Sequence, residues 1–484
     1  MDSFVAKFAD TLPATFRISG RITGNNANGL SGVPVMLSGS LTGLQWTLAN
    51  GNFSFGNLPA GGNYTVTPLT TRFSFAPINR AFDNLNNDQT SDFIGTAQNL
   101  VFFNPGTYRV NENNLRVPIT VNRTGDTTAA ASVDYVTSDG SASERKDYNT
   151  AIGTLRFAPG ETSKTFDILL TDDNFAEANE TILLTLNNPT GGIDVGTPNK
   201  AVITIISNDA GSPSNPADST SFFVRQHYVD FLNRLPDSSG QSFWNNQINS
   251  CGSNAQCIEV RRIDVSASFF LSIEFQQTGY LVERIYKSAF GDAQGASTFG
   301  SNHQLNVPIV RFSEFIKDTQ RIGQGVVVLQ AGWEQALENN KQAYTLEFVQ
   351  SARFIMALPT TMAPAQFVDT LNQNAGMVLS ASERTTAINL FSGAADTSNV
   401  TARAQALRQI AEDTDLYNAE YNRAFVLAEY FGYLRRNPND TPDSDYTGYD
   451  FWLTKLNQFN GNYINAEMVK AFLSSIEYRQ RFGP

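Results

Sequence analysis

The stretch TDDNFAEANETI places four carboxylates, Asp172, Asp173, Glu177 and Glu180, within nine residues. It lies between FDILL and TILLTL, two apolar runs that predict β-strands. Carboxylates this close repel one another by roughly 1–4 kcal/mol per pair at surface dielectrics. Either a cation compensates them or they separate into water. The cation that suits such a loop is Ca²⁺, which takes about six to eight hard oxygen ligands.

The overall charge narrows the choice of partners. The 484 residues include 34 Lys and Arg against 46 Asp and Glu, a net charge of −12, and no basic run occurs. Nucleic acid and anionic membranes are therefore poor partners, whereas divalent cations suit the chain. The sequence also contains no apolar run of roughly 18 residues, so no transmembrane segment is expected.

The first residues, MDSFVAKFADTLPATF, lack the basic region and long apolar core of a signal peptide. The chain is therefore either cytoplasmic or a fragment of an exported protein that lacks its signal peptide. Abundant Ser, Thr, Asn and Gly with few Lys favour the fragment, and hence an extracellular or cell-surface location. Cys251 and Cys257 could form a disulfide or remain free thiols, and export favours the disulfide. Only two histidines occur, His227 and His303, which nearly excludes His-based metal and catalytic sites.

Composition divides the chain into a strand-rich part and a helical part. We predict a multidomain protein: two all-β sandwiches at 1–97 and 98–210, a Pro/Ser/Asn linker at 211–220, and an all-α domain with an internal repeat at 221–484.

The first sandwich is indicated by FRISGRITG and VPVMLSG, which alternate apolar and polar residues, and by Asn50-Gly51, which predicts a type I′ hairpin turn. Together with NGNFSFGNLPAGGNYTVTP and FDNLNNDQTSDFIGTA, these segments resemble the transthyretin-like or carboxypeptidase-regulatory-like β-sandwich, an Ig-like fold. The resemblance implies a spacer or binding module.

The second sandwich carries the acidic stretch. VFFNPGTYRVNENNLRVPITVNRTG, VDYVTSDGSASERKDY, GTLRFAPGETSKTFDILL and AVITIISNDA occur in the order typical of the Calx-beta domain, which this region resembles, and DDxxxExxE is the most specific part of the match. The resemblance implies a β-sandwich that binds Ca²⁺ at one tip, with an additional backbone carbonyl near Phe175. The implied carboxylate ligands are Glu112, Asp147, Asp172, Asp173, Glu177, Glu180 and Asp209.

Three positions depart from the calcium-rich members of that family: Asn179, Ser207 and Asn208 are neutral. Fewer charges mean lower affinity, so one or two weak sites are expected. The competing interpretation is a solvated acidic loop in which Asp172 and Asp173 make only turn and strand-end hydrogen bonds.

The helical part repeats one plan: an aromatic helix, a Pro-containing turn, a Gly, and then Phe-Trp, as in Phe243-Trp244 and Phe451-Trp452. FLSIEFQQ and SSIEYRQ are a second pair of similar segments in the two copies. YVDFLNRLPDSSGQSFW and YFGYLRRNP…GYDFW resemble a family of unknown function found at the ends of large secreted bacterial proteins, distantly like phycobilisome linker domains. The resemblance implies a fold and no activity. Trp244 and Trp452 could stack on sugars, but their helical spacing favours a core position.

No GxSxG, HExxH, P-loop or GxGxxG motif occurs, so a non-catalytic role is favoured. The leading hypothesis is a calcium-stabilised modular surface or secreted bacterial protein acting in adhesion, cell-envelope scaffolding or matrix assembly, with a protein or glycan partner. The alternatives are a carbohydrate- or envelope-binding module that uses an aromatic patch of the helical domain, and an accessory part of a secreted hydrolase.

Overall fold

The structure, a computed structural model, describes residues 14–70, 72–209, 211 and 214–483. Within these residues the chain forms two β-sandwiches and then a helical region, each around its own hydrophobic core. The predicted fold class is therefore confirmed. The first 13 residues, and part of the predicted linker at 211–220, lie outside the described residues. No helix of the described residues is both long and apolar enough to cross a membrane.

The first sandwich packs two sheets of order β4-β1-β9-β6, with β8 beside β1, and β3-β2-β5-β7. The strands are β1 (Thr15–Gly24), β2 (Pro34–Gly39), β3 (Gly43–Trp46), β4 (Asn52–Pro59), β5 (Tyr64–Pro68), β6 (Phe73–Ala76), β7 (Arg80–Phe82), β8 (Gln89–Thr90) and β9 (Phe93–Ala97). The alternating residues Val35 and Leu37 of β2 point into the core with Phe53 and Phe55 of β4. This is the period-two pattern of a half-buried strand.

The Asn50-Gly51 turn differs in one respect from the hairpin predicted for it. Gly51 has φ +82°, which suits a turn glycine, and its N–H donates to the Leu48 carbonyl at 2.8 Å. However, β3 and β4 on either side belong to different sheets. The turn connects the two layers of the sandwich, because β3 pairs with β2 and β4 pairs with β1.

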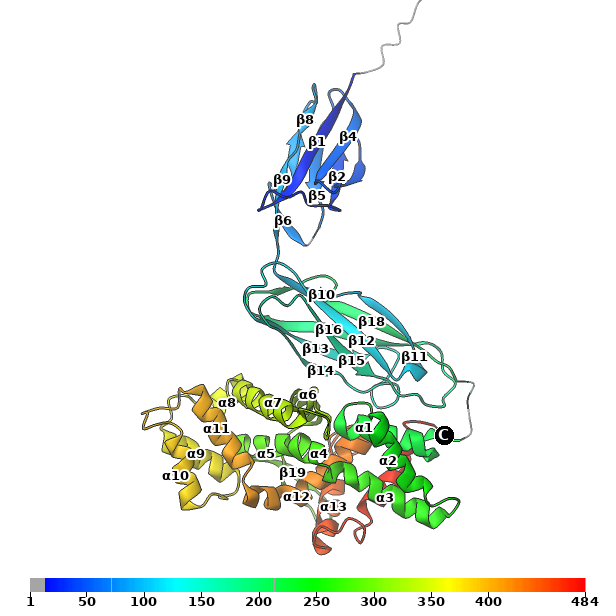
Figure 1. The fold of residues 1–484 in the computed structure, drawn as a ribbon, viewed down its shortest axis with the longest axis vertical. Helices are drawn as coiled ribbons and strands as arrows, with labels where there is room; N and C mark the ends of the chain where they lie inside the picture. Colours follow the sequence, from blue (N-terminus) through cyan, green and yellow to red (C-terminus); the bar gives the residue numbers. More distant parts are fainter. Residues whose placement is uncertain (1–13, 71, 210, 212–213, 484) are drawn as a thin grey trace, which may run out of the picture.

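The second sandwich has sheets of order β15-β12-β10-β17 and β11-β18-β16-β13-β14. Its elements are β10 (Leu100–Phe103), β11 (Thr107–Asn111), the 3₁₀ turn η1 (Glu112–Asn114), β12 (Arg116–Arg123), β13 (Ala131–Asp139), β14 (Ile152–Phe157), β15 (Ser163–Leu169), β16 (Glu180–Thr190), β17 (Asp194–Val195) and β18 (Lys200–Ile206). Edge strands β14 and β15 lie on one side of this sandwich, and β14 contacts α6 of the helical region. Figure 1 shows this sandwich lying along the helices, while the first sandwich stands away from them.

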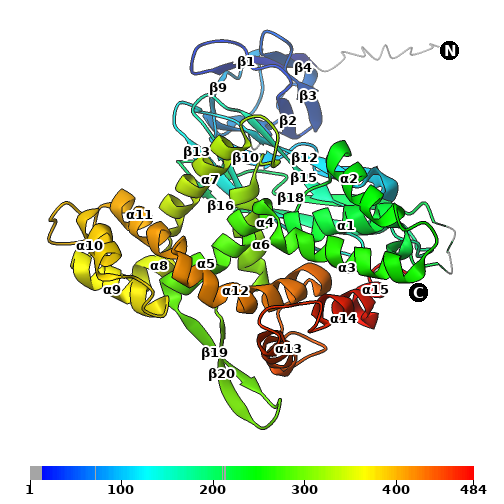
Figure 2. The ribbon, with the colours of Figure 1, turned by 60° about the horizontal axis from the view of Figure 1, so that its bottom comes forward.

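The helical region contains η2 (Pro216–Asp218), α1 (Thr220–Leu232), α2 (Ser238–Asn249), α3 (Ala255–Leu271), α4 (Ile273–Gln277), α5 (Gly279–Phe290), α6 (Phe312–Gly323), α7 (Trp333–Phe348), α8 (Ala352–Ala357), α9 (Pro364–Asn374), α10 (Ala381–Asn389), α11 (Val400–Ala411), α12 (Thr414–Glu429), the π-helical η3 (Tyr430–Leu434), α13 (Thr447–Gln458), α14 (Met468–Ser474) and α15 (Ile476–Arg479). It also contains a hairpin that the all-α prediction lacks, β19 (Asp292–Ser297) with β20 (His303–Pro308). The hairpin projects from the helices in Figure 2. A disulfide joins Cys251, which follows α2, to Cys257 in the first turn of α3, with the Cα atoms 5.5 Å apart.

The internal repeat is visible in matching contacts of α1–α4 and η3–α15. Phe243 and Trp244 meet edge to face with ring centroids 4.8 Å apart and 76° between planes, and Phe451 and Trp452 have the same two values. Both tryptophans are half-buried and pack on the core, as their helical spacing predicts. The two copies therefore share local geometry as well as sequence.

A second set of matching contacts follows the Phe-Trp pairs. Arg234 pairs through two nitrogens with Glu274, and Arg436 pairs in the same way with Glu477. Each arginine also lies over a tyrosine of the preceding helix, Tyr228 or Tyr430. The arginines thus fix the turn after the first helix of each copy to its last helix.

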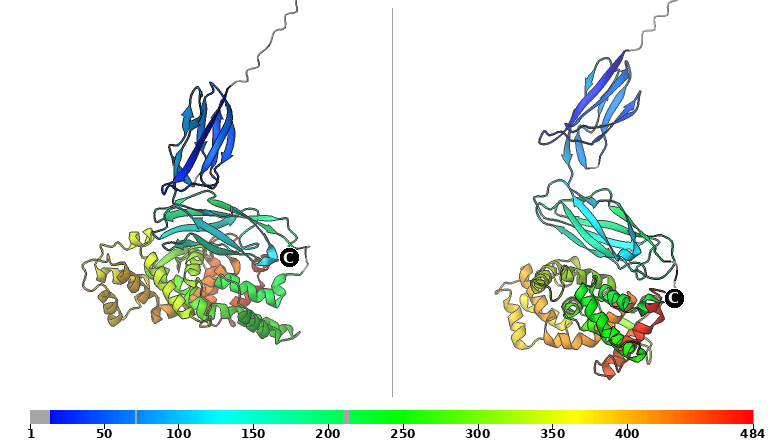
Figure 3. Two further views of the ribbon diagram at one scale, coloured as in Figure 1. Left: turned by 45° about the horizontal axis from the view of Figure 1, so that its top comes forward. Right: turned by 45° about the vertical axis from the view of Figure 1, so that its right-hand side comes forward.

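The second sandwich is held on the helical region by two buried arginines: Arg435 makes an ion pair with Glu144, and Arg481, whose own ion pair with Asp230 lies within the helical region, makes a hydrogen bond. Arg481 donates to both carboxylate oxygens of Asp230 at 2.9 Å and to the Arg145 carbonyl at 2.7 Å. Arg435, 2% exposed, lies 3.3 Å from Glu144. Buried charges persist when they are paired and hydrogen-bonded, so these contacts fix the two parts against each other. Both views of Figure 3 show the same close approach.

Candidate metal centre

The seven predicted carboxylates gather at one end of the second sandwich, because each lies where a strand ends or begins. Glu112 opens η1 directly after β11, Asp147 precedes β14, and Asp209 follows β18. The remaining four lie in the segment between β15 and β16, where Glu180 is the first residue of β16. Strands of both sheets therefore deliver acidic side chains to the same tip.

Two groups of three carboxylates form within this tip. One oxygen from each of Glu112, Asp172 and Asp209 lies within 4.8 Å of the other two. Oxygens of Asp147, Asp173 and Glu177 form a second group with the same spacing limit. Six of the seven predicted residues are thus brought together by the fold in two groups.

Glu180 is the seventh predicted residue and belongs to neither group. The neighbouring charges of Asp147, Glu177 and Glu112 act on it. Its burial, followed by these neighbouring acids, raises the pKa of Glu180 to about 8. Glu180 therefore borders the second group.

Burial and mutual repulsion also shift the other acids. Burial, with charges from Asp209 and Asp172, raises the pKa of Glu112 to about 7. Burial raises the pKa of Asp173 to about 8, and the charges of Glu112 and Glu177 add to the effect. The pKa values of Glu177 and Asp209 are also raised, chiefly by burial. Without a cation, the tip is strained by its own negative charge.

Local hydrogen bonds position the carboxylates without satisfying them. Asp173 is 2% exposed, and its Oδ1 accepts the Phe175 N–H at 2.7 Å. Glu112 Oε1 accepts the Asp173 N–H at 2.9 Å, and Asp147 Oδ2 accepts the Ser143 N–H at 2.6 Å. Among the described residues, however, Asp173 Oδ2 and Asp209 Oδ2 are buried and have no hydrogen-bond partner. The turn bonds of the competing solvated-loop interpretation are present, but they leave these two oxygens free.

The donor set fits a calcium ion. Hard carboxylate oxygens from several loops, two of them buried and unpaired, match what Ca²⁺ requires and what a softer metal would not select. Of the neutral residues at the tip, Asn208 Oδ1 accepts the Asn113 N–H at 3.2 Å and Ser207 Oγ accepts the Asp209 N–H at 3.4 Å. Asn208 therefore supports η1, and Ser207 supports the segment that follows β18. The carbonyl near Phe175 stays a prediction.

Sequence reasoning missed one charged residue at this tip. Arg225 of α1 places Nη2 3.7 Å from Asp172 Oδ2. It lies 53 positions along the chain in an otherwise unremarkable helix, so no local pattern signals it. The acidic loop also touches the chain end, since the Asn174 N–H donates to the Phe482 carbonyl at 3.3 Å.

Comparison with known proteins agrees with this geometry. The family model of the Calx-beta domain matches residues 95–209. Residues 95–209 therefore form a Calx-beta domain.

Three relatives each match about a quarter of this chain. Extracellular matrix protein 3 of Lytechinus variegatus is 39% identical over 123 residues, which cover 24% of this chain and 4% of that protein. The sodium/calcium exchanger Calx of Drosophila melanogaster is 37% identical over 109 residues, 22% of this chain and 12% of the exchanger. A crystal structure of the apo-form Calx CBD1 domain is 36% identical, with a TM-score of 0.23, and covers 23% of this chain and 97% of that structure. The chain thus spans a small fraction of these curated relatives.

Proposed function

We propose that the Calx-beta domain of this chain binds calcium at the acidic tip. The observation that carries the proposal is the pair of three-carboxylate groups, each with oxygens within 4.8 Å of one another. The unpaired buried oxygens of Asp173 and Asp209 add support, because each gains a partner when a cation enters. Glu112, Asp172 and Asp209 would hold one ion, and Asp147, Asp173 and Glu177, with Glu180 beside them, a second.

The bound ion would act by cancelling the repulsion among these acids. A divalent charge favours the ionised form of every neighbouring carboxylate, which the tip by itself disfavours. The neutral residues Asn179, Ser207 and Asn208 limit the total charge, so affinity should lie toward the weaker, extracellular end of the calcium range, about 10⁻⁴–10⁻³ M.

The consequence for the whole chain would be a firmer junction between the sandwich and the helical region. The loop with Asp172 and Asp173 contacts Arg225 and Phe482, and the loop that ends at Asp147 carries the Glu144 contact to Arg435. If calcium orders either loop, it also orders the contacts that this loop makes with the helical region. Calcium would therefore fix the sandwich on the helices.

In the cell, we propose a non-catalytic modular protein, secreted or at the surface of a bacterium, acting in adhesion, envelope scaffolding or matrix assembly. Two β-sandwiches in tandem and a relative named as an extracellular matrix protein support this role. We further propose domain limits of 1–97, 98–210 and 221–484, with 211–220 as the linker.

The test is calcium titration of the full chain by calorimetry. Wild type should bind calcium with a dissociation constant near 10⁻⁴–10⁻³ M, and magnesium should bind more weakly. Asp173→Asn should weaken calcium binding at least about tenfold, a loss of about 1.4 kcal/mol. The matched control is Asp194→Asn, an exposed acid outside both groups. Equal calcium binding by Asp173→Asn and Asp194→Asn would overturn the proposed site.

A further inference from the structure

One edge strand of the first sandwich, β3, presents apolar side chains to solvent. Leu44 is 54% exposed and Trp46 is 59% exposed. The strand register places Met36 of β2 beside Leu44, and Pro34 beside Trp46. Leu69, just after β5, is also exposed, and its N–H donates to the Pro34 carbonyl at 2.7 Å. Paired residues of neighbouring strands lie on the same face of a sheet, so these side chains form one apolar patch on its outer face.

The backbone of β3 is open to a further strand. Among the described strands, β3 pairs with β2 alone. The carbonyl of Pro34 accepts from the β5 side, so the backbone groups of the next residue, Val35, face β3 and its partner Gln45. The backbone groups of Gln45 therefore face β2, and those of Leu44 and Trp46 face the free edge.

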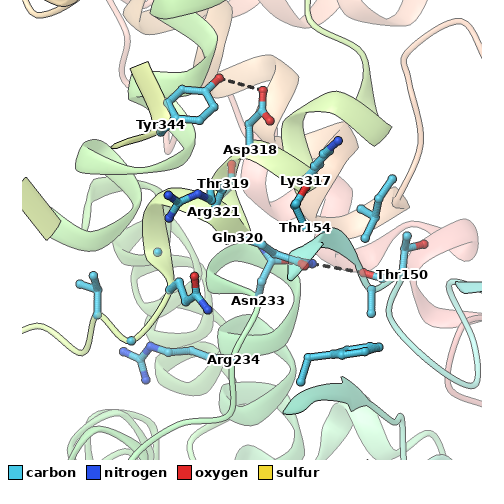
Figure 4. Close-up of a pocket in the computed structure, with 18 of the residues that line it drawn as sticks. Thr150, Thr154, Asn233, Arg234, Lys317, Asp318, Thr319, Gln320, Arg321 and Tyr344 are labelled. Atoms are coloured by element: carbon cyan, nitrogen blue, oxygen red, sulfur yellow. Dashed lines mark hydrogen bonds between the residues drawn. The ribbon is translucent and has the colours of Figure 1, made fainter. Parts of the chain in front are cut away.

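The edges of the second sandwich are protected in ways that β3 is not. Exposed sheet edges are usually blunted by charged side chains or covered by another element. The edge strands β11, β14, β15 and β17 each carry a charged residue. Strand β14 is also covered, since Figure 4 shows Gln320 of α6 donating to the Thr150 carbonyl just before it, at 3.2 Å. Strand β3, GLQW, carries no charge.

Charge is absent from the whole segment that contains β3. Residues 22–71 include no Asp, Glu, Lys, Arg or His. Residues 14–97 contain four arginines and three aspartates, although the whole chain carries a net charge of −12. Figure 1 shows the first sandwich standing away from the helical region. Two copies of this acidic chain repel each other, and the β3 edge is a place where they can meet with little repulsion.

The β3 edge is complementary to itself. A two-fold axis beside Gln45 places Leu44 of each copy opposite Trp46 of the other. Each such antiparallel pair exchanges two backbone hydrogen bonds, because both residues direct their N–H and C=O groups to the edge. The same pairing brings the two apolar patches side by side and removes part of each from water. A charged partner, by contrast, finds no opposite charge in residues 22–71.

We propose that β3 pairs with β3 of a second copy, which joins the two four-stranded sheets and makes the chain a weak homodimer. The contact closes on itself, so association stops at the dimer. It uses no residue of the acidic tip and requires no calcium. Failure of this proposal therefore leaves the calcium site in place, and the reverse also holds.

The first experiment is sedimentation equilibrium of the full chain in chelator. Wild type should dimerise with a dissociation constant of about 1–30 μM, the weak range expected of a short interface. Trp46→Lys places a charge on the edge and should weaken dimerisation at least about tenfold. The matched control is Ile94→Lys, the same kind of change at a 50% exposed residue of β9, an inner strand of the other sheet.

A crosslink tests the register without disturbing the apolar patch. In the proposed pairing Gln45 lies opposite itself in a non-hydrogen-bonded pair, with Cα atoms about 4.5 Å apart, which a disulfide can span. Gln45→Cys should form a covalent dimer under mild copper–phenanthroline oxidation, whereas Ser54→Cys at an exposed position of β4 should not. The native Cys251 and Cys257 are already joined to each other, so only the introduced thiol reports.

The proposal is overturned if the wild-type chain stays monomeric up to about 300 μM, ten times the weakest expected constant. Equal dimerisation of Trp46→Lys and Ile94→Lys, or equal crosslinking at positions 45 and 54, would overturn it as well. Species larger than a dimer would contradict the two-fold pairing. A chain that dimerises only after removal of residues 1–13 would assign the edge to that segment instead.

Discussion

Asp172 Oδ2 lies 3.7 Å from Nη2 of Arg225, so a carboxylate of the acidic tip faces a guanidinium from the helical region. Asp172 also shares its group with Glu112 and Asp209. A cation in that group and Arg225 would therefore both contact Asp172. Each would weaken the attraction of this carboxylate for the other. The calcium affinity of the tip should depend on a residue outside the Calx-beta domain.

Arg225→Gln should tighten calcium binding about three- to tenfold. Unit charges about 4 Å apart interact by about 1 kcal/mol even in water, and removing the positive charge removes that repulsion of the ion. Calorimetry on the full chain measures the effect, with substitution of the exposed Arg261 of α3, Arg261→Gln, as the control. Weaker binding in Arg225→Gln would mean that the arginine helps to build the site instead of opposing the ion.

Asp173→Asn should stabilise the calcium-free protein while weakening its response to calcium. Burial holds the pKa of Asp173 near 8, so at pH 8 the ionised form costs stability that a neutral amide avoids. Asn can still accept the Phe175 N–H. Thermal unfolding of the sandwich in chelator should show a midpoint a few degrees above wild type, as expected for about 1 kcal/mol. A lower midpoint in chelator would contradict the strained-tip interpretation.

The stability of the calcium-free protein should fall as pH rises from about 4.5 to about 8. The pKa values of Glu112, Asp173 and Glu180 are about 7, 8 and 8, all above their ordinary values. The folded state therefore holds protons that the unfolded chain has released, and this advantage is full at low pH and lost as pH passes the folded pKa values. Urea unfolding in chelator across this range measures the slope.

Saturating calcium should flatten or reverse that slope, because the ion requires the ionised carboxylates and binds better as pH rises. The same urea series with calcium is the comparison. If stability falls equally steeply with pH with and without calcium, the raised pKa values are unrelated to metal binding.

Arg481→Met should destabilise the helical region by about 3–5 kcal/mol. The substitution leaves Asp230 buried without its two charged hydrogen bonds, and breaking a buried pair from one side has this magnitude. Arg479→Met is the control, since its pair with Asp218 is exposed and should matter by about 0–1 kcal/mol. Denaturant unfolding followed by tryptophan fluorescence reports both, and similar losses would show that burial does not decide the effect.

Ser272→Ala and Ser475→Ala should each cost about 1 kcal/mol. Both serines are N-caps at equivalent positions of the repeat, accepting from the Phe275 and Tyr478 N–H groups at 3.1 Å. Denaturant unfolding of each single variant gives the comparison. A loss confined to one serine would show that the two copies differ energetically despite their common geometry.

Sequence predicted the acidic tip because its signal is local. Strand patterns on both sides of DDxxxExxE fix where the loop must lie, and the resemblance supplied Glu112, Asp147 and Asp209 from distant strands. The contacts of Arg225, Arg435 and Arg481 could not be predicted, because their partners lie far away in the chain. The local sequence around an arginine does not show whether its side chain is solvated or buried.

The β19–β20 hairpin escaped for a different reason. DAQGAS and HQLNVP contain few β-branched or aromatic residues, so neither segment shows the composition of a strand. Their pairing depends on the surrounding helices and on the Tyr446 N–H, which donates to the Ala296 carbonyl at 2.9 Å. The sequence predicts the Asn50-Gly51 turn. It does not show which sheets the flanking strands join, because that depends on tertiary packing.

The repeat in the helical region has a consequence for how that region holds together. Phe231 and Tyr433 occupy equivalent places in the two copies, yet they pack on each other with ring centroids 5.1 Å apart. Gly432 leaves room for this contact, because a Cβ at that position would lie 2.5 Å from the Phe231 ring. Each copy thus completes the interior of the other, as two subunits of a dimer do, although one backbone carries both. Residues 214–290 and 412–483, produced as separate polypeptides, should therefore associate when mixed, and size-exclusion chromatography of the mixture would reveal whether they do.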